Sequence, residues 1–349
     1  MSAIPRTIDE VTPAWLRDVA RLPCETAEIT QIGVGIGVSS ALYRVALEGG
    51  DCPASVVVKL PALDDAAVFT STMLRMYIRE VAFFEQLAAK VPVRVPSMYH
   101  GECDPETSSF VVVMEDMAGM RIVDQLGGMA VEDAEVAVDA LAGWHAIWWR
   151  DADHLAEAGV AVSLGDPVYP AVLPIVFGEG WEKMTSEMDV APAMAAIGPR
   201  WTDAMPQLLQ DLAAQPATLC HGDYRADNIL FQADGSPVLL DFQLTGTGSG
   251  AYDLAYFMTQ SLEADVAEAH ERRLFERYRD ALRTAGVPEG DLGDDLWLSY
   301  RKAALFCLVY PVVAGRGMDM SDPRQLALLQ CMNTRFTRAA DQLELDQLL

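Results

Sequence analysis

The sequence lacks the features of several protein classes. Basic residues are few, since 25 Lys and Arg stand against 51 Asp and Glu, a formal net charge of −26. Nucleic acids and anionic membranes are bound by clustered Lys and Arg, and no such cluster occurs, so neither is an expected partner. The acidity is typical of a soluble protein; the alternative is an acidic groove for a cationic substrate.

Cysteine pairs and long apolar runs are also missing. The 6 cysteines form no CxxC pair and no disulfide-framework spacing, so we expect reduced thiols in a reducing compartment. The opening MSAIPRTIDE has no apolar segment, and the longest apolar run, AALFCLVYPVVAG, is too short for a membrane span and contains Pro311. We therefore predict a cytoplasmic protein. No repeat, low-complexity segment or GxxxxGK[ST] loop is present, which excludes a Walker-type nucleotide site.

Residues 1–118 are predicted to form a small lobe built on antiparallel strands. A short helix capped by Thr12 comes first. Alternating residues then predict strands before and after the glycines of GVGIGVSS and in SVVVKL, and strands return in VRVPSMYHGECDPETSSFVVVMEDM. Between them, DAAVFTSTMLRMYIREVAFFEQLAAK lacks Gly and Pro and predicts one long helix over residues 65–90.

Residues 119–349 are predicted to form a larger, mainly helical lobe. Helical patterns cover residues 254–285, 292–310 and 322–346, while residues 151–215 are rich in proline and apolar residues without a clear period. The 349 residues are enough for two lobes, and the mixture of strands and helices predicts an α+β fold.

The stretch HGDYRADNILFQADGSPVLLDFQ carries the clearest chemical signal. Asp223, Asn228 and Asp241 lie at fixed distances between short apolar runs. Phosphoryl transfer needs these residue types: one acid accepts the proton of the attacking hydroxyl, an amide five residues later holds metal, and a second acid on a strand holds metal between the phosphates. Asp and Asn alone could be turn formers, but an unpaired acid beside VLL would be costly, and a metal ion would compensate it.

The motifs HGDYRADNILF and LLDFQ resemble those of the aminoglycoside phosphotransferase and choline kinase-like small-molecule kinases. The form DFQ, followed by YDLAYFMTQSL, is most similar to the ecdysteroid kinase-like branch. The resemblance covers residues from about Ile32 to Tyr310 and implies a two-lobed protein-kinase-like fold with ATP and Mg²⁺. One departure is Gln243, where protein kinases have Gly, so a flipping metal loop is not expected.

The resemblance also implies roles for the residues of this stretch. It makes Asp223 the catalytic base and Asn228 and Asp241 the magnesium ligands, with His221 and Asp253 supporting the loop. Asp253 could instead be a plain helix cap.

Arg225 has two open interpretations. It could contact a phosphate or the substrate, or it could form a salt bridge to a neighbouring acid.

In the small lobe, the glycines Gly33, Gly35 and Gly37 stand between two predicted strands. A dinucleotide fingerprint would need a helix next, so the pattern favours a kinase-type phosphate loop, to which Ser39 could add a donor. The alternative for Ser39 is an ordinary turn residue.

Lys59 ends the strand SVVVKL and resembles the lysine that holds the nucleotide phosphates; a solvated strand end is the alternative. Its expected partner is Glu80 on the long helix, with Glu85 as the substitute if the helical register differs. FVVVMEDMAG resembles the segment joining the lobes, where the backbone from Glu115 to Met117 would bind adenine.

The aromatic stretch WHAIWWR is interpreted as core rather than as a ligand site. Trp144, Trp148 and Trp149 follow helical spacing, which predicts packing, and His145 is interpreted as a helix histidine with a hydrogen-bond partner.

The predicted function is ATP-dependent transfer of a phosphate to a hydroxyl of a small molecule. Only eleven residues separate Asp241 from Asp253, too few for the segment on which protein kinases bind a peptide. An aminoglycoside, choline-like amine, sugar, steroid or hydroxyacyl acceptor stays open. Two alternatives are a catalytically silent nucleotide-binding protein and a metal-dependent phosphohydrolase using His221, Asp223 and Asp241; the hydrolase is disfavoured because such sites need several His ligands.

Overall fold

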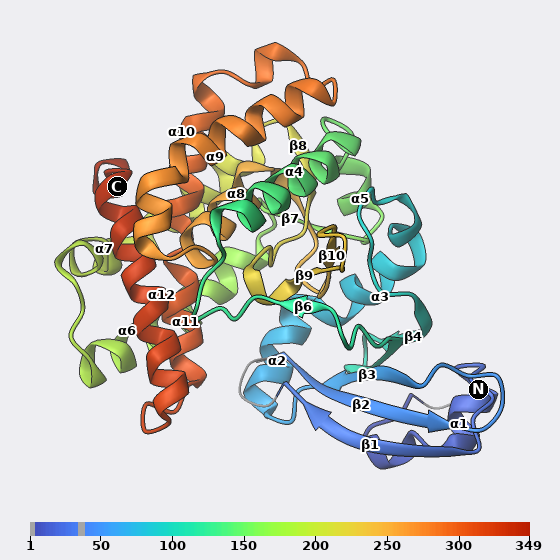
Figure 1. Cartoon of the computed structure of the whole chain (residues 1–349). Coiled ribbons are helices and arrows are strands. Elements are labelled where there is room, and N and C mark those ends of the chain that lie inside the picture. Colours follow the sequence, from blue (N-terminus) through green and yellow to red (C-terminus); the bar gives the residue numbers. More distant parts are fainter. Residues whose placement is uncertain (1–3, 34–38) are drawn as a thin grey trace. The chain divides into compact units, whose positions relative to one another are not determined.

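The computed structural model describes residues 4–33 and 39–349, which divide into two compact units. The first unit contains residues 1–90 and 95–120, and the second contains residues 91–94 and 121–349. The first unit is built on an antiparallel sheet and the second is mainly helical (Figure 1), so the predicted α+β class is confirmed.

The first unit is organised by a five-stranded sheet in the order β1-β2-β3-β5-β4, with every neighbouring pair antiparallel. Its strands are β1 (Thr26–Ile32), β2 (Ser40–Glu48), β3 (Ser55–Pro61), β4 (Met98–Asp104) and β5 (Ser109–Glu115). The apolar residues of β3 and β5 are buried, because one face of the sheet packs on the N-terminal segment and the other on a helix. Val56, Val58 and Val113 share a core with Leu16 of the first helix.

The helices of the first unit correct one prediction. They are α1 (Pro13–Asp18), α2 (Asp65–Met73) and α3 (Met76–Gln86), with the 3-10 turns η1 (Ile8–Glu10) and η2 (Ala88–Lys90). The single helix predicted over residues 65–90 is wrong, because Arg75 lies in the left-handed region at φ 56°. The Arg79 guanidinium donates a 2.6 Å hydrogen bond to the Leu74 carbonyl at this break, which the pattern of apolar residues does not reveal.

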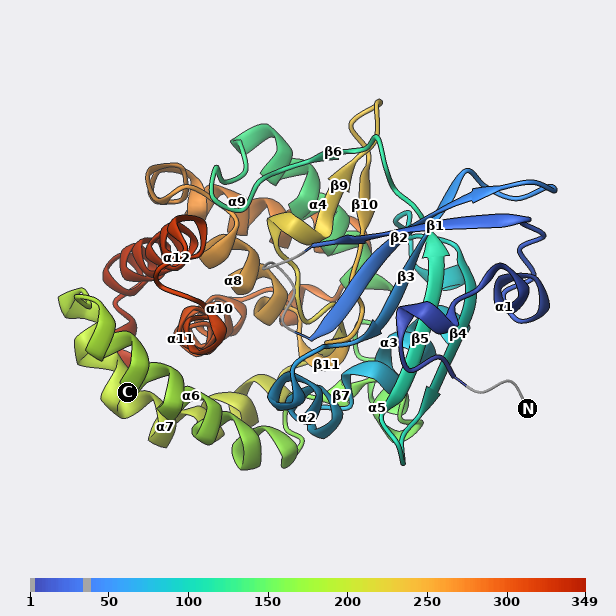
Figure 2. The same ribbon diagram turned by 90° about the horizontal axis from the view of Figure 1, so that it is seen from below.

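The second unit contains most of the helices and two small sheets (Figure 2). The helices are α4 (Val131–Ile147), α5 (Asp153–Glu157), α6 (Val168–Glu187), α7 (Pro192–Ala213), α8 (Ala251–Gln260), α9 (Ala264–Thr284), α10 (Asp294–Phe306), α11 (Val309–Gly317) and α12 (Pro323–Gln342). Three 3-10 turns are η3 (Ala226–Asn228), η4 (Glu289–Asp291) and η5 (Leu345–Leu348). The strands are β6 (Arg121–Ile122), β7 (Val162–Ser163), β8 (Ala217–Cys220), β9 (Ile229–Phe231), β10 (Pro237–Leu239) and β11 (Gly246–Ser249), in the orders β10-β9-β6 and β7-β11-β8.

The core of this unit lies around α8, whose residues are all buried. The residues that the sequence shows as aperiodic fold into α6 and α7, which contain Pro174, Pro199 and Pro206 in their interiors. Trp201 of α7 is fully buried and stacks on Phe177 of α6 with ring centroids 4.2 Å apart. Packing therefore outweighs the hydrogen bonds that the prolines remove.

Two predicted helices end earlier than expected. The helix predicted over residues 254–285 is interrupted between α8 and α9, where the Gln260 carbonyl accepts a 2.7 Å hydrogen bond from Arg335. The helix predicted over residues 292–310 is two helices, because α10 ends at Phe306 and α11 begins at Val309. Pro311 has no backbone N–H and cannot continue the helical hydrogen bonds across this division.

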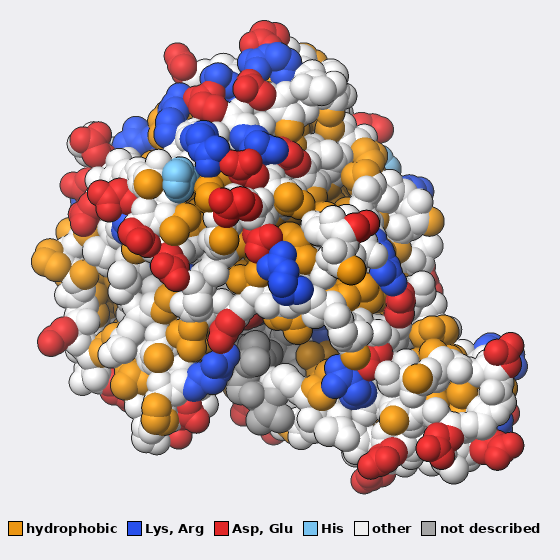
Figure 3. Space-filling model, in the orientation of Figure 1, with side chains coloured by type: hydrophobic (Ala, Val, Ile, Leu, Met, Phe, Trp, Pro, Cys, Tyr) orange, Lys and Arg blue, Asp and Glu red, His pale blue; other side chains and the backbone are white. Residues whose placement is uncertain are grey.

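The surface of the second unit mixes acids with bases. Five arginines of α9 each pair with a carboxylate of α4, of α9 itself or of η4, and Figure 3 shows basic and acidic side chains interspersed on the upper part of this face. They are Arg272, Arg273, Arg277, Arg279 and Arg283.

Residues Glu289–Gly317 are long and apolar enough to cross a membrane, but 67% of the most apolar window is buried within the unit. The helices of this stretch, α10 and α11, are therefore buried in the way that core helices are. All 6 cysteines are free thiols.

Candidate active site

The site begins at the end of β8, where the chain turns sharply. Gly222 has φ 86°, and a Cβ at this position would lie 1.9 Å from the carbonyl oxygen of Leu244. Only glycine fits this turn without displacing backbone, and the turn presents the next residue, Asp223.

Asp223 is held by its neighbours on the same loop. The Asn228 Nδ2 donates to the Asp223 carboxylate at 2.8 Å and to its backbone carbonyl at 2.9 Å. The Arg225 Nε donates to the other carboxylate oxygen at 3.2 Å, and the Arg225 Nη1 donates to Asp227 at 2.7 Å. Burial alone would lower the pKa of Arg225, but the nearby carboxylates, Asp223 above all, outweigh burial and raise the pKa. The salt bridge, one of the two interpretations of Arg225, is thus present.

Asp241 lies two residues after β10 and has φ 65°, a conformation that non-glycine residues rarely adopt. The Leu240 N–H donates to the Asn228 carbonyl at 2.9 Å, so the backbone beside Asp241 is fixed to the loop that carries Asn228. Gln243, the departure from the protein-kinase pattern, donates its amide to the Asp241 carboxylate at 3.1 Å. The two predicted metal ligands are therefore on directly bonded segments.

Asp253 holds the backbone of the loop that carries Asp223 and is not a helix cap. Its carboxylate accepts the backbone N–H of His221 at 2.6 Å and that of Gly222 at 2.9 Å, and it lies 3.1 Å from His145 Nε2. The other His145 nitrogen contacts the Tyr278 hydroxyl at 2.7 Å. Both predictions, that His145 has a hydrogen-bond partner and that Asp253 braces the loop, agree with this geometry.

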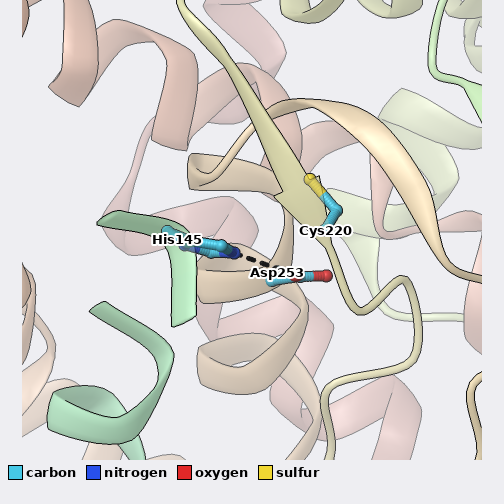
Figure 4. Close-up of side chains that lie close together, drawn as sticks. All are labelled: His145, Cys220 and Asp253. Carbon is cyan, nitrogen blue, oxygen red and sulfur yellow. Dashed lines mark hydrogen bonds and ion pairs between the residues drawn. The ribbon is translucent and has the colours of Figure 1, made fainter. Parts of the chain in front are cut away.

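His145, Cys220 and Asp253 together form a buried cluster of metal-ligand types (Figure 4). Both Asp253 oxygens accept backbone hydrogen bonds, both His145 nitrogens have partners, and the Cys220 thiol points toward the Ser249 carbonyl at 3.6 Å. Burial raises the pKa of the Cys220 thiol well above its ordinary value. The three side chains are thus engaged in a hydrogen-bond network.

His221 is also used in hydrogen bonding. Its Nε2 lies 3.0 Å from the Leu240 carbonyl and its Nδ1 accepts the Asp223 N–H at 3.3 Å, which corresponds to a neutral ring protonated at Nε2. Burial lowers the pKa of His221 in spite of the opposing effect of Asp253. His221 therefore joins the two loops through its ring.

In the first unit, Lys59 of β3 and Glu80 of α3 form a buried ion pair at 2.8 Å. This is the partner expected from the sequence, and Glu85 is exposed. Burial of both charges without water requires such pairing.

The remaining small-lobe predictions fall partly outside the described residues. Gly33 is described and has φ 66°, and the Ser39 carbonyl accepts the Tyr77 hydroxyl at 2.9 Å. Gly35 and Gly37 lie outside the described residues.

Glu115 ends β5, and its N–H bonds the Ser97 carbonyl at 2.8 Å. Asp116, next to it, accepts from Arg44 and Ser55, both at 2.7 Å, and Met117 is buried.

Three tyrosines near the Asp223 loop were not anticipated. Tyr252 and Tyr256 come from α8 and Tyr310 from α11; the Tyr252 hydroxyl donates to the Gly222 carbonyl at 3.2 Å, and Tyr256 stacks on Tyr310 and interacts electrostatically with Asp223. The signal was present in YDLAYF, where two tyrosines four residues apart share a helix face next to Asp253.

The family assignment rests on the sequence as a whole. The model of the phosphotransferase enzyme family (APH) matches residues 30–289, which includes the loop of Asp223, Asp241 and the Lys59–Glu80 pair. The chain belongs to this family. A search of curated proteins finds no match.

Solved structures share the fold of this phosphotransferase. A choline kinase from Cryptosporidium parvum Iowa II superposes with a TM-score of 0.57 at 12% identity, covering 96% of this chain and 93% of that one. A microcompartment-associated aminopropanol kinase gives 0.56 at 16% identity and covers 96% of each chain. The GDP complex of aminoglycoside 2′-phosphotransferase-IIIa gives 0.54 at 16% identity, covering 91% of this chain and 96% of that one. The protein-kinase-like fold is therefore shown.

Proposed function

We propose that this phosphotransferase moves the γ-phosphate of ATP to a hydroxyl of a small molecule, with Asp223 as the catalytic base. The observation that supports this most directly is the double restraint on the Asp223 carboxylate by Asn228 and Arg225, at 2.8 and 3.2 Å. Such restraint keeps a base at a fixed position and direction, which is the main requirement of phosphoryl transfer.

The chain offers oxygen ligands that suit Mg²⁺. Because Asn228 Nδ2 donates to Asp223, its Oδ1 is turned away from that residue, and Asp241 is held at positive φ beside the same loop. Carboxylate and amide oxygens are the ligands that Mg²⁺ prefers, so Asn228 and Asp241 would hold it. When bound, the ion would neutralise charge on the phosphates.

The protein's own groups would perform the remaining steps. Asp223 accepts the proton of the acceptor hydroxyl as that oxygen attacks the γ-phosphorus, and the bond from phosphorus to the ADP oxygen breaks. Lys59, oriented by Glu80, acts on the nucleotide phosphates, and the backbone from Glu115 to Met117 binds the base. Free cysteines support action in the cytoplasm, and the eleven residues between Asp241 and Asp253 support a small hydroxylated acceptor.

The test is ADP release with Mg-ATP against pools of hydroxylated metabolites, antibiotics and lipophilic alcohols. One pool should raise the rate, and Asp223→Asn should lower turnover about 100- to 10,000-fold, the range for losing a general base, while ATP binding is kept.

The matched control is Asp234→Asn, which removes an acid from the turn between β9 and β10 and should leave the rate unchanged. A rate in Asp223→Asn equal to that of the native protein would disprove the mechanism. Running GTP in parallel identifies the nucleotide.

The two alternative functions are less well supported. A hydrolase would need His221 as a metal ligand, but both its nitrogens take part in hydrogen bonds. A silent nucleotide-binding protein has no need to keep Lys59, Glu80 and the three residues of the loop together. ADP formation that depends on an acceptor would exclude both.

A further inference from the structure

The hydroxyl of Tyr77 lies between the ends of two strands of the first unit. Strands β2 and β3 pair as far as Ser40↔Pro61, where their ladder ends. One residue beyond this pair, the Tyr77 hydroxyl donates to the Ser39 carbonyl at 2.9 Å and accepts the Ala62 N–H at 3.3 Å. A side chain from a helix thus bridges the two backbones at the position where the next pair of strand residues would meet.

Tyr77 is also held by its ring. It lies on α3, is only 2% exposed, and stacks on Phe110 of β5 with ring centroids 4.7 Å apart and planes 18° apart. A buried tyrosine needs partners for its hydroxyl, and here the hydroxyl is used both as a donor and as an acceptor. Packing therefore fixes the ring, and the hydroxyl can hold the two strand ends in one arrangement.

Both strand ends lead to groups that the proposed function assigns to the nucleotide phosphates. Ser39 belongs to the glycine-rich stretch GVGIGVSS and directly precedes β2. Ala62 comes three residues after Lys59. Glu80, which pairs with Lys59 at 2.8 Å, follows Tyr77 by three residues on α3, nearly one helical turn. One side chain thus connects the predicted phosphate loop, the strand of the lysine and the helix of the glutamate.

We propose that Tyr77 is a positioning residue for the nucleotide phosphates, which acts through the backbone at Ser39 and the strand of Lys59. This rests on the proposed function, because it assumes that Lys59 and the glycine-rich stretch meet the phosphates. Without the hydroxyl, the strand ends would have more than one arrangement, and binding of the phosphates would have to select one of them. That cost would lower the affinity for phosphates, but not the affinity for the base and ribose.

The experiment compares Tyr77→Phe with the native protein, because phenylalanine keeps the ring on Phe110 and removes only the hydroxyl. Calorimetry measures the dissociation constants of Mg-ATP, Mg-ADP and adenosine for each protein. Tyr77→Phe should weaken the binding of Mg-ATP about fivefold, the effect of losing roughly one hydrogen bond, and should leave the affinity for adenosine unchanged.

Two control variants separate the hydroxyl of Tyr77 from general stability. Tyr99→Phe removes a partly exposed hydroxyl from β4 of the same sheet and should change neither affinity. Val45→Ala shortens a buried side chain of β2 in the core that contains Leu16. It should lower the melting temperature and keep the ratio of the Mg-ATP and adenosine affinities at its native value.

Three results would overturn the role of Tyr77. They are an unchanged affinity for Mg-ATP in Tyr77→Phe, an equal loss of affinity for adenosine, and a variant that does not fold, since the hydroxyl would then serve stability alone. None of them touches the proposed function, which is tested by the binding of Mg-ATP to the native protein and by its release of ADP with an acceptor. A native protein that binds no Mg-ATP would overturn both, so the two failures are distinguishable.

Discussion

Replacing Asp253 by asparagine should destabilise the second unit strongly and disable the loop of Asp223. The carboxylate is fully buried and accepts two backbone hydrogen bonds, from His221 and Gly222, in addition to its contact with His145. An asparagine keeps one acceptor oxygen, and its NH₂ group would face a backbone N–H that has no other partner on this side.

The magnitude follows from the number of bonds lost. Hydrogen bonds to a charged group contribute about 1.5–3 kcal/mol each. An asparagine whose oxygen takes the place of Oδ2 keeps the contacts with His221 and His145 and loses the bond from Gly222, so the cost is about 1.5–3 kcal/mol. This is a large share of the roughly 5–15 kcal/mol that stabilises a folded domain. Because the substitution also frees the turn at Gly222, kcat should fall more than nucleotide affinity.

Tryptophan fluorescence during urea unfolding is a suitable assay, because all the tryptophans except Trp15 lie in the second unit. Asp139→Asn is the control: its partly exposed carboxylate pairs with Arg277, and its loss should cost no more than about 1 kcal/mol. A surface substitution changes the free energy of unfolding by about 0.5 kcal/mol or less. If the free energy of unfolding of Asp253→Asn differs from that of the native protein by no more than this, the bracing role is refuted. Should Asp253→Asn not fold, His145→Gln alters the contacts with Asp253 and Tyr278 but leaves both backbone bonds of Asp253 in place, and it should lower the stability by less.

Three further results are expected. Gly222→Ala should lose most soluble expression, because its Cβ would collide with the Leu244 carbonyl; a well-folded, active variant would contradict this. Burial lowers the pKa of His221 below its ordinary 6.5, so the unfolded chain binds a proton that the folded chain does not, and stability should fall as the pH drops below about 6.5. Histidine NMR should show the Nε2-protonated ring, and a charged ring at pH 6.5 would contradict this. Asp241→Ala should weaken Mg-ATP binding measured by calorimetry, and unchanged affinity would show that the metal site is misassigned.

The sequence was informative where local pattern and chemistry coincide. The strands of the small lobe follow from alternation, which is a short-range pattern, whereas the partner of Lys59 was expected from the resemblance to kinases. The breaks at Arg75 and after Gln260 could not be predicted: there the carbonyls of Leu74 and Gln260 accept hydrogen bonds from Arg79 and Arg335, contacts that the pattern of apolar residues does not reveal. The prolines within α6 and α7 likewise hide these helices in the sequence, because long-range packing decides that the segments are helical.

The site shows the same division. The identities at Asp223, Asn228 and Asp241 are visible in the sequence, and their hydrogen bonds agree with the spacing. The interaction of Tyr256 with Asp223 depends on how α8 packs against the loop, and spacing alone does not give that for residues of two different elements. Gln243, which stands where protein kinases have Gly, can be interpreted only from the structure, in which its amide donates to Asp241.

The short connection between Asp241 and Asp253 bears on how such an enzyme can be regulated. Its middle part is β11, the central strand between β7 and β8, and the hydroxyls of Thr245, Thr247 and Ser249 belong to buried side chains. Protein kinases are switched on by phosphates added to an open segment at this place in the chain. Here a modifying enzyme would first have to extract a strand from the centre of a sheet. Regulation by phosphates added to this segment is therefore not expected, because its hydroxyls are held inside the sheet.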